Sequence, residues 1–420
     1  MRLAGPAEQE QFAESLHDML AAADGPAAAR AWAAGDRVPG LAAWRALATL
    51  GVTALAVPER AGGLGASFTD VVVACEDIGH HALPGPVAES VAAGPVLLAA
   101  LPASPLSENE LSEIVVSESA VSGGAPSKQA RSGGAPAGAD QSAADQSGTD
   151  VSGADVSGAD VSGADVSGAD VSGAGAPGGW LAGLADGELI ATLAAPPWLP
   201  FAADADAAGL VLRAEGGVVR LATPGARYRS VDRARSLFET ADGRVLAGGP
   251  AAAAAVARAL DAGALASAAQ LLGAGRALLE ASVRHARQRA QFGRPIGSFQ
   301  AVKHHLADVA IGLEFAGPLL YAAAVTLDDG GRHAARDVSA AKVAGTDAAR
   351  RAARVALQVH GAIGYTEEHD LHLWLAKVRA LAGAWGGQAE HRARVMAAIT
   401  APEHGPGPTR PEAAGEPAWN

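Results

Sequence analysis

An arginine and two glycines between two helical stretches form the first segment whose residues could do chemistry. Arg289 closes the first stretch, Gly293 and Gly297 permit a tight turn, and a new helix is expected from Ser298. A guanidinium fork suits a phosphate, and the free N–H groups of a helix start attract anions. The segment therefore indicates an anion site. The alternative is a solvated cationic helix end that complements the helix dipole.

A second segment, QVHGAIGYTEEHDLHLW (residues 358–374), combines glycines with closely spaced histidines. Gly361 and Gly364 let the backbone leave a helix and approach another group closely. His369 and His372 could form one face of a metal site, but no second ligand pair of that kind follows, so surface or capping histidines are favoured over a metal. The lone Cys75 excludes a cysteine-based zinc or iron–sulfur site and is expected to be buried. No bound metal is expected.

Together the two segments resemble the acyl-CoA dehydrogenase family. The stretch RAQFGRPIGSFQ (residues 289–300), followed by Leu-Ala-Asp, carries the first motif, and QVHGAIGYTEE (residues 358–368) carries the second. LAVPERAGGLG (residues 55–65) and EDIG (residues 76–79) agree as well. The resemblance covers about residues 1–103 and 250–400 and is greatest for an actinobacterial branch whose members often pair unlike subunits.

The resemblance implies FAD as cofactor, an acyl-CoA thioester as substrate and electron-transfer flavoprotein as electron acceptor. It also implies a dimer in which residues of one protomer reach the FAD of its neighbour. By position, Arg289 matches the contact to the FAD diphosphate, and four further residues match other cofactor contacts: Phe292, Gln300, Gln358 and Gly361.

The chain departs from the family where a catalytic carboxylate should stand. The usual glutamate position, just before a glycine, holds Trp385, and the alternative position on the first long C-terminal helix holds Gly263. Asp261 and Glu368 are the weak candidates for a substitute base, although Glu368 matches a position that supports the turn. The flavin-contacting stretch of the middle domain is replaced by AAPPWLP (residues 194–200), so the flavin pocket of this chain is expected to be eroded.

Three hypotheses follow from this pattern. The first is a subunit of a heteromeric FAD-dependent acyl-CoA dehydrogenase, with the catalytic carboxylate supplied by a partner. The second is a self-sufficient dehydrogenase with an unusual base, and the third is a non-catalytic protein that retains only the fold. The acyl group is left open between bulky steroid side chains and ordinary fatty acyl chains.

The chain is expected to be mainly helical with a small β domain, which is an α+β class. The sheet of the β domain is expected to be barrel-like, and the C-terminal helices are expected to form a four-helix bundle. We expect an N-terminal helical domain (1–103), a middle β domain (104–249), a helical bundle (250–400) and a flexible tail (401–420). A VSGAD repeat within about residues 117–179 predicts a disordered insert. Helices are expected at 9–23, 41–50, 67–80, 88–101, 250–292, 298–327, 337–361, 371–384 and 388–399. Short strands are expected at 187–193, 208–213 and 217–221, and an extended run at 51–58.

Composition limits the functions that remain. The 420 residues carry a formal net charge of −13, which argues against a nucleic-acid groove. Hydrophobic residues make up 49% and aromatic residues 4%, which favours closely packed helices over sheets. No targeting segment and no membrane span is expected, which predicts a soluble cytoplasmic protein.

Overall fold

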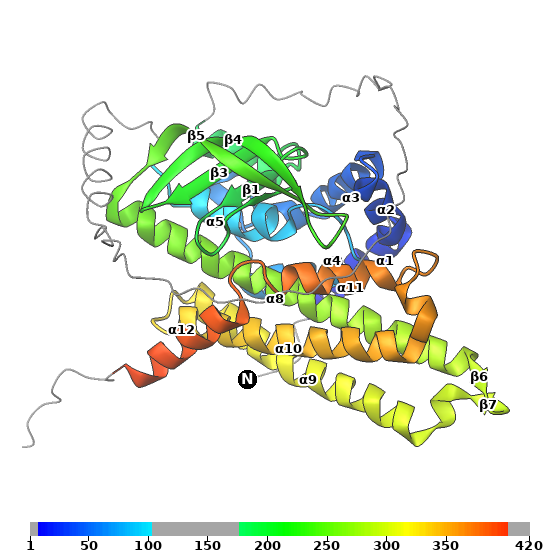
Figure 1. Cartoon of the computed structure of the whole chain (residues 1–420). Helices are drawn as coiled ribbons and strands as arrows, with labels where there is room; N and C mark the ends of the chain where they lie inside the picture. Colours follow the sequence, from blue (N-terminus) through cyan, green and yellow to red (C-terminus); the bar gives the residue numbers. More distant parts are fainter. Residues whose placement is uncertain (1–6, 103–175, 402–420) are drawn as a thin grey trace, which may run out of the picture.

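A computed structural model describes residues 7–102 and 176–401 (Figure 1). The expected insert and tail lie outside these residues, apart from residues 176–179 at the start of helix α7 and residue 401. N-terminal helices, drawn blue and cyan, flank a small green sheet, and the long helices of the C-terminal half lie beneath both. Helices and one small sheet therefore form the expected α+β architecture.

The N-terminal part is helical, with two departures from expectation. No helix was expected directly after the one at 9–23, but a second helix, α2, begins there. The Asp24 carboxylate accepts a hydrogen bond from the N–H of Ala27 at the start of α2. The run expected to be extended (51–58) instead contains a short 3₁₀ turn, in which the buried Thr53 hydroxyl donates to the Ala185 carbonyl at 2.9 Å. The elements are α1 (Ala7–Ala22), α2 (Gly25–Ala33), α3 (Val38–Thr49), η1 (Val52–Ala54), η2 (Glu59–Ala61), α4 (Phe68–His80), the π-helix η3 (Ala88–Ala93) and α5 (Gly94–Ala99).

A five-stranded sheet follows α7 (Pro177–Ala185), in the order β1-β3-β4-β5-β2. Within this sheet only β1 and β3 pair in parallel. Gly216 and Gly217 form the hairpin turn between β3 and β4, both with positive φ. The Thr192 hydroxyl of β1 donates to the Ala203 carbonyl of β2 at 2.7 Å, which curls the sheet towards a barrel. The strands are β1 (Ala191–Ala194), β2 (Ala202–Ala203), β3 (Leu210–Glu215), β4 (Val218–Arg229) and β5 (Ser236–Ala247).

Helix α8 is the centre of the C-terminal bundle and packs against α4, α9, α10 and α11. It approaches α4 backbone to backbone, because a Cβ at Gly273 would lie 1.7 Å from the Glu76 carbonyl oxygen and one at Gly79 would lie 2.2 Å from that of Gln270. These glycines join the N-terminal helices to the bundle. The bundle helices are α8 (Gly249–Gln288), α9 (Gln300–Asp328), α10 (Ala334–His360), α11 (Leu371–Leu381) and α12 (Gln388–Thr400).

Two of these helices, α8 and α9, are long and apolar enough to cross a membrane by length and composition. In α8, 61% of the most apolar window is buried inside the protein, as in the core helix of a folded bundle. In α9 the figure is 39%, because one face of that helix is exposed. The apolar character of α8 is thus explained by internal packing. Internal packing covers less of α9, and part of its apolar surface is exposed.

Candidate functional site

The turn after α8 presents the first group of predicted residues to solvent. Arg289 caps α8, and a short hairpin of β6 (Ala290–Gln291) and β7 (Arg294–Pro295) follows. Phe292, at the hairpin tip, has a φ of 53° and is 92% exposed. Arg289, Phe292 and Gln300, where α9 begins, are all exposed. The predicted guanidinium and phenyl ring are therefore free to contact another molecule.

The end of α10 lies beside this turn, so the structure brings the two motifs together. The buried ring of His360 packs at a tilt against His285 of α8, 4.3 Å away, and edge-on against His369, 5.0 Å away between ring centroids. Burial lowers the pKa of His360. Gln358 and Gly361 are exposed, and Gly361 has the positive φ of 63° expected of a turn glycine. All five predicted cofactor contacts thus lie on one solvent-facing end of the bundle.

His369 and His372 of the second motif contact backbone groups near the start of α11 through their Nδ1 atoms. His369 Nδ1 accepts a hydrogen bond from the N–H of Leu371 at the start of α11. His372 Nδ1 lies 2.9 Å from the His369 carbonyl oxygen. Both rings are therefore occupied with local backbone groups.

The two positions at which the family's carboxylate is expected touch each other. Trp385 is 1% exposed, and its ring atoms lie 2.2–2.5 Å from where a Cβ at Gly263 would stand. Only a glycine lets the indole lie this close to α8. An aromatic ring, and no carboxylate, therefore fills the space between the two positions.

The loop after β1 packs against the segment that contains Trp385. The ring of Trp198 lies 2.9–3.1 Å from where a Cβ at Gly386 would stand. His391 packs edge-on against this ring at 5.2 Å, and the Arg394 guanidinium lies over it, also at 5.2 Å. We call Trp198, Trp385, Gly263 and Gly386 the tryptophan pad. It occupies the part of the chain where the resemblance places the flavin contacts.

The candidate bases are engaged or exposed. Both oxygens of the buried Asp261 carboxylate accept hydrogen bonds from Arg394, at 2.5 and 3.2 Å, which joins α8 to α12. Burial raises the pKa of Asp261 and Arg394 opposes this shift. Glu368 is exposed on the turn after α10, and its neighbour Glu367 pairs with Arg233. Neither carboxylate is part of the tryptophan pad.

Sequence reasoning missed a set of buried charges around this place. The Lys342 ammonium of α10 donates to the Ser267 hydroxyl at 2.6 Å and to the Leu381 carbonyl, and burial lowers its pKa to about 7. Glu89, also buried, faces Arg235 at 3.8 Å. The one available signal was a lysine on an otherwise alanine-rich helix face.

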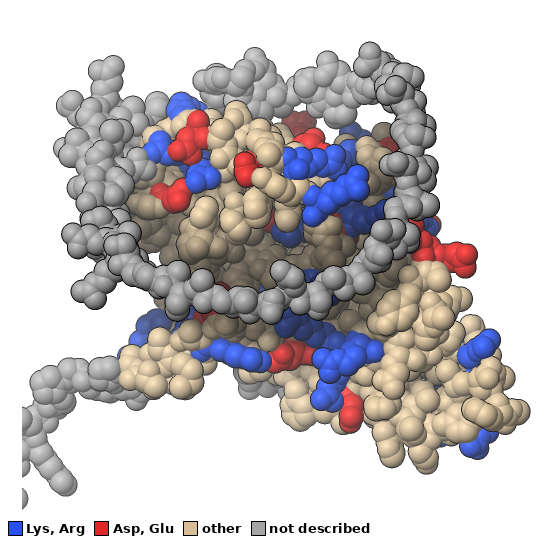
Figure 2. All heavy atoms as spheres, viewed as in Figure 1, with Lys and Arg blue, Asp and Glu red and all other residues tan. Residues whose placement is uncertain are grey.

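A cavity and a groove lie beside the tryptophan pad. The cavity, next to Trp385, Glu89 and Lys377, holds only about 20 Å³. The groove, about 380 Å³, lies between the sheet and α11 and is lined by Trp198 and by Arg229, Arg235 and Arg379. Figure 2 shows Lys and Arg along both sides of the hollow between the sheet and the helices. Guanidinium groups in such a groove suit phosphate.

Two family models match the chain at its two ends. The acyl-CoA dehydrogenase N-terminal domain matches residues 6–101, and the acyl-CoA dehydrogenase C-terminal domain matches residues 253–400. The chain belongs to the acyl-CoA dehydrogenase family. Both predicted motifs lie within the second match.

Relatives of known name agree with this assignment. Acyl-CoA dehydrogenase IpdE2 of Mycobacterium tuberculosis is 26% identical over 382 residues, which is 90% of this chain and 92% of that protein. Two solved structures share the fold. A variant of the Tcur3481-Tcur3483 steroid ACAD has a TM-score of 0.65 at 20% identity, covering 93% of this chain and 97% of the other. The ChsE4-ChsE5 complex of M. tuberculosis has a TM-score of 0.63 at 19% identity, covering 96% and 100%.

FAD, the cofactor of this family, fits one part of the chain and not another. The exposed end with Arg289, Gln358 and Gly361 offers a guanidinium, an amide and an open backbone, which suit a diphosphate. The cavity beside Trp385 holds about 20 Å³, whereas cofactor pockets take about 300–1,000 Å³. A flavin ring does not fit in that cavity, and the larger groove lined by Trp198 lies between the sheet and α11.

Proposed function

We propose that this chain is a subunit of an FAD-dependent acyl-CoA dehydrogenase in which a second, unlike subunit supplies the flavin-ring pocket and the catalytic carboxylate. Arg289, Phe292, Gln300, Gln358 and Gly361 would contact the cofactor held by that partner. FAD would supply the hydride acceptor for α,β-desaturation of an acyl-CoA thioester. Family membership supports the general activity, and the division of labour between subunits is the proposed part.

The observation that carries this proposal is the buried contact between Trp385 and Gly263. A general base must reach the proton that it removes, at about 2.6–3.2 Å or through one water. At both family positions this chain offers an indole or a glycine. Asp261 is held by Arg394 and Glu368 is exposed, so neither supports a self-sufficient enzyme.

An apolar exposed face on α9 supports the presence of a partner. Ile311, Phe315 and Leu319 follow one another at intervals of four residues and are 54%, 75% and 46% exposed. This spacing places them on one side of the helix. A row of exposed apolar side chains on one side of a helix is typical of protein–protein contacts.

The arginines of the groove and the solved relatives support a class of substrate and a type of assembly. Arg229, Arg235 and Arg379 support binding of the phosphates of FAD or of acyl-CoA. The solved relatives include a steroid ACAD and a two-protein complex, which favours a bulky acyl group and a heteromeric assembly. Electron-transfer flavoprotein would accept the electrons, and we expect the complex in the cytoplasm.

The test is co-expression with candidate dehydrogenase partners, followed by visible absorption spectra of the purified chain and of each complex. We expect the chain alone to be colourless and a complex with its partner to be yellow and active. Arg289→Ala should lower the affinity of the complex for FAD at least tenfold, whereas Arg287→Ala, at an exposed arginine two residues earlier on α8, should not. A yellow homodimer that oxidises acyl-CoA by itself would overturn the proposal.

A further inference from the structure

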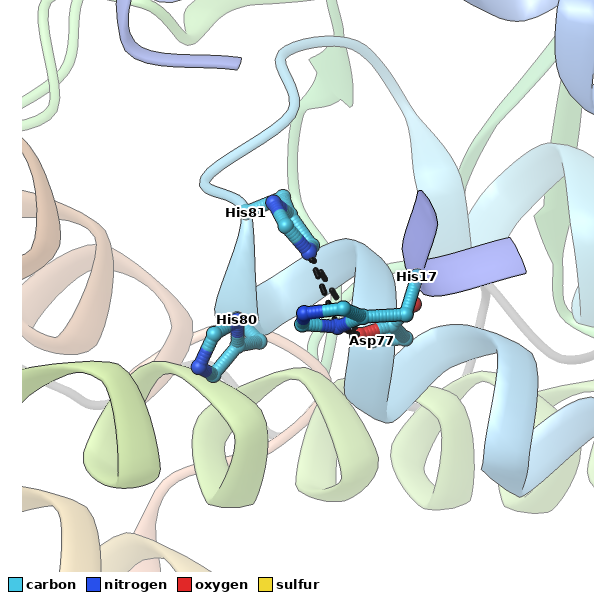
Figure 3. Close-up of side chains that lie close together, drawn as sticks. All are labelled: His17, Asp77, His80 and His81. Atoms are coloured by element: carbon cyan, nitrogen blue, oxygen red, sulfur yellow. Dashed lines mark hydrogen bonds and ion pairs between the residues drawn. The ribbon is translucent and has the colours of Figure 1, made fainter. Parts of the chain in front are cut away.

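Three histidines and an aspartate gather where α1 meets the end of α4, in a part of the molecule that the proposed function does not use (Figure 3). His17 comes from α1, Asp77 and His80 from the last turn of α4, and His81 is the residue that caps α4. Each side chain offers one nitrogen or oxygen atom, and these four atoms all lie within 4.8 Å of one another. Three imidazoles and a carboxylate are a donor set that transition metals prefer.

Three of the four atoms already have the spacing of metal ligands. His17 Nδ1 lies 3.0 Å from Asp77 Oδ1 and 3.1 Å from His81 Nε2. His81 Nε2 lies 3.7 Å from Asp77 Oδ1. Tetrahedral zinc with bonds of about 2.0–2.2 Å holds its ligand atoms about 3.3–3.5 Å apart. The triangle therefore has the size of one face of a zinc tetrahedron.

The fourth side chain is oriented by a carboxylate from another helix. His80 Nε2 lies 3.1 Å from Glu280 Oε2 on α8. A carboxylate that holds one ring nitrogen of a histidine and leaves the other for the metal is the usual outer contact of zinc ligands. Glu280 would thus fix the ring of His80 while its remaining nitrogen binds.

Two buried polar atoms of the cluster lack hydrogen-bond partners. Asp77 Oδ2 and His80 Nδ1 are both buried, and neither has a partner among the residues that the structure describes. Buried polar atoms are ordinarily satisfied, and an unsatisfied one indicates a missing water or ion. A cation coordinated by the free nitrogen of His80 would satisfy that atom, and it would satisfy Asp77 Oδ2 as well if the carboxylate bound through both oxygens.

The surroundings favour a cation and keep the cluster accessible. The cluster opens into a groove of about 640 Å³ at the junction of α1, α4 and α8. Arg276 is the basic residue in the groove lining and pairs with Glu76 at 2.8 Å. The acidic residues that line the groove besides Asp77 are Glu10, Glu14, Asp18, Glu76 and Glu280.

We propose that His17, Asp77, His80 and His81 form a binding site for one divalent transition-metal ion, with Zn²⁺ as the best fit. The ion ties α1 to the end of α4, and the open groove lets water reach it. This site is independent of the proposed subunit function. The alternative, a metal-free ion-pair cluster that only holds the two helices together, is an outcome of the test.

The test is titration of Zn²⁺ into the full chain, purified without a histidine tag and stripped with EDTA, by isothermal titration calorimetry. We expect one equivalent of Zn²⁺, and Co²⁺ in its place should give the visible absorption of a tetrahedral site. His17→Ala should weaken binding at least tenfold. Asp77→Asn, which has nearly the same shape, should also weaken it at least tenfold, and Zn²⁺ should raise the unfolding midpoint of the wild type and not of this variant.

The control is His304→Ala/His305→Ala, which removes a second pair of adjacent histidines, exposed on α9. It should bind Zn²⁺ like the wild type. The proposal is overturned if the wild type binds no stoichiometric Zn²⁺, even where Asp77→Asn lowers stability, since the cluster is then an ion-pair network alone. It is equally overturned if the control loses as much affinity as His17→Ala, because the metal then binds elsewhere.

Discussion

Glycine at position 263 matters because the absence of a side chain there leaves room for the indole of Trp385. The indole of Trp385 occupies the space that a Cβ at Gly263 would fill, with ring atoms 2.2–2.5 Å from that point. Alanine is a better helix former than glycine by about 1 kcal/mol, so Gly263→Ala should stabilise α8 if the ring were absent. The close contact and the helix preference therefore oppose each other at a single residue.

A double-mutant cycle measures this opposition. Gly263→Ala should lower the free energy of unfolding by about 1–3 kcal/mol, because it overpacks a buried contact. Trp385→Ala should lower it by about 3–5 kcal/mol through the cavity it leaves. In the Trp385→Ala background, Gly263→Ala should become neutral or stabilising. Urea unfolding of the four proteins checks this, and additive effects would contradict the contact on which the proposed function depends.

Single residues could be singled out from the sequence, but their contacts with distant residues could not. Arg289 was singled out because a guanidinium, glycines and a helix start form a recognisable anion pattern, and Gln358 because residues 358–368 resemble the family's second motif. The replacement of carboxylates by Trp385 and Gly263 was also visible, but their contact was not, because it joins residues 122 positions apart. The metal cluster was missed for the same reason. The sequence Asp77-x-x-His80-His81 was a signal, but its third partner, His17, comes from another helix.

At the scale of elements, the long helices were predictable and the polar strands were not. Helices α8, α9 and α10 begin and end within a few residues of expectation, since their apolar positions recur at helical spacing. The outer part of β4 and all of β5 escaped prediction. Many of their residues face solvent, so they lack the alternation of apolar and polar residues that marks a half-buried strand.

The exposed apolar face of α9 predicts which substitution should weaken association with a partner subunit. Phe315 is 75% exposed on the apolar face, so Phe315→Glu should leave the stability of the isolated chain within about 0.5 kcal/mol of the wild type. The same change should weaken association with the partner subunit at least tenfold, because it places a charge in an apolar contact. Analytical ultracentrifugation measures the association. Glu314→Gln, at the exposed position next to it, is the control, and equal weakening in both variants would show that the face is not the contact.

At the scale of the whole molecule, cofactor-binding features are divided between two regions. The exposed end of the bundle offers Arg289 and Gln358 to a cofactor outside the chain, while the tryptophan pad closes the place where a ring would lie inside it. A homodimer of such chains would have two diphosphate contacts and no ring pocket at the pad. In the proposed function, an unlike partner with an open pocket completes the site.

This division predicts the cofactor stoichiometry of the assembled enzyme. In a pair of unlike subunits, the partner's ring pocket can be completed by Arg289 of this chain, whereas the pocket of this chain stays filled by Trp198 and Trp385. The complex should therefore contain one FAD for every two chains. Trp385→Ala in the complex should not raise this ratio, because Trp198 and the neighbouring Asp261–Arg394 pair remain in place. Release of FAD by denaturation, followed by its spectrophotometric quantification against protein concentration, gives the ratio. A value of one FAD per chain would mean that the tryptophan pad opens in the assembly and that both subunits hold a flavin.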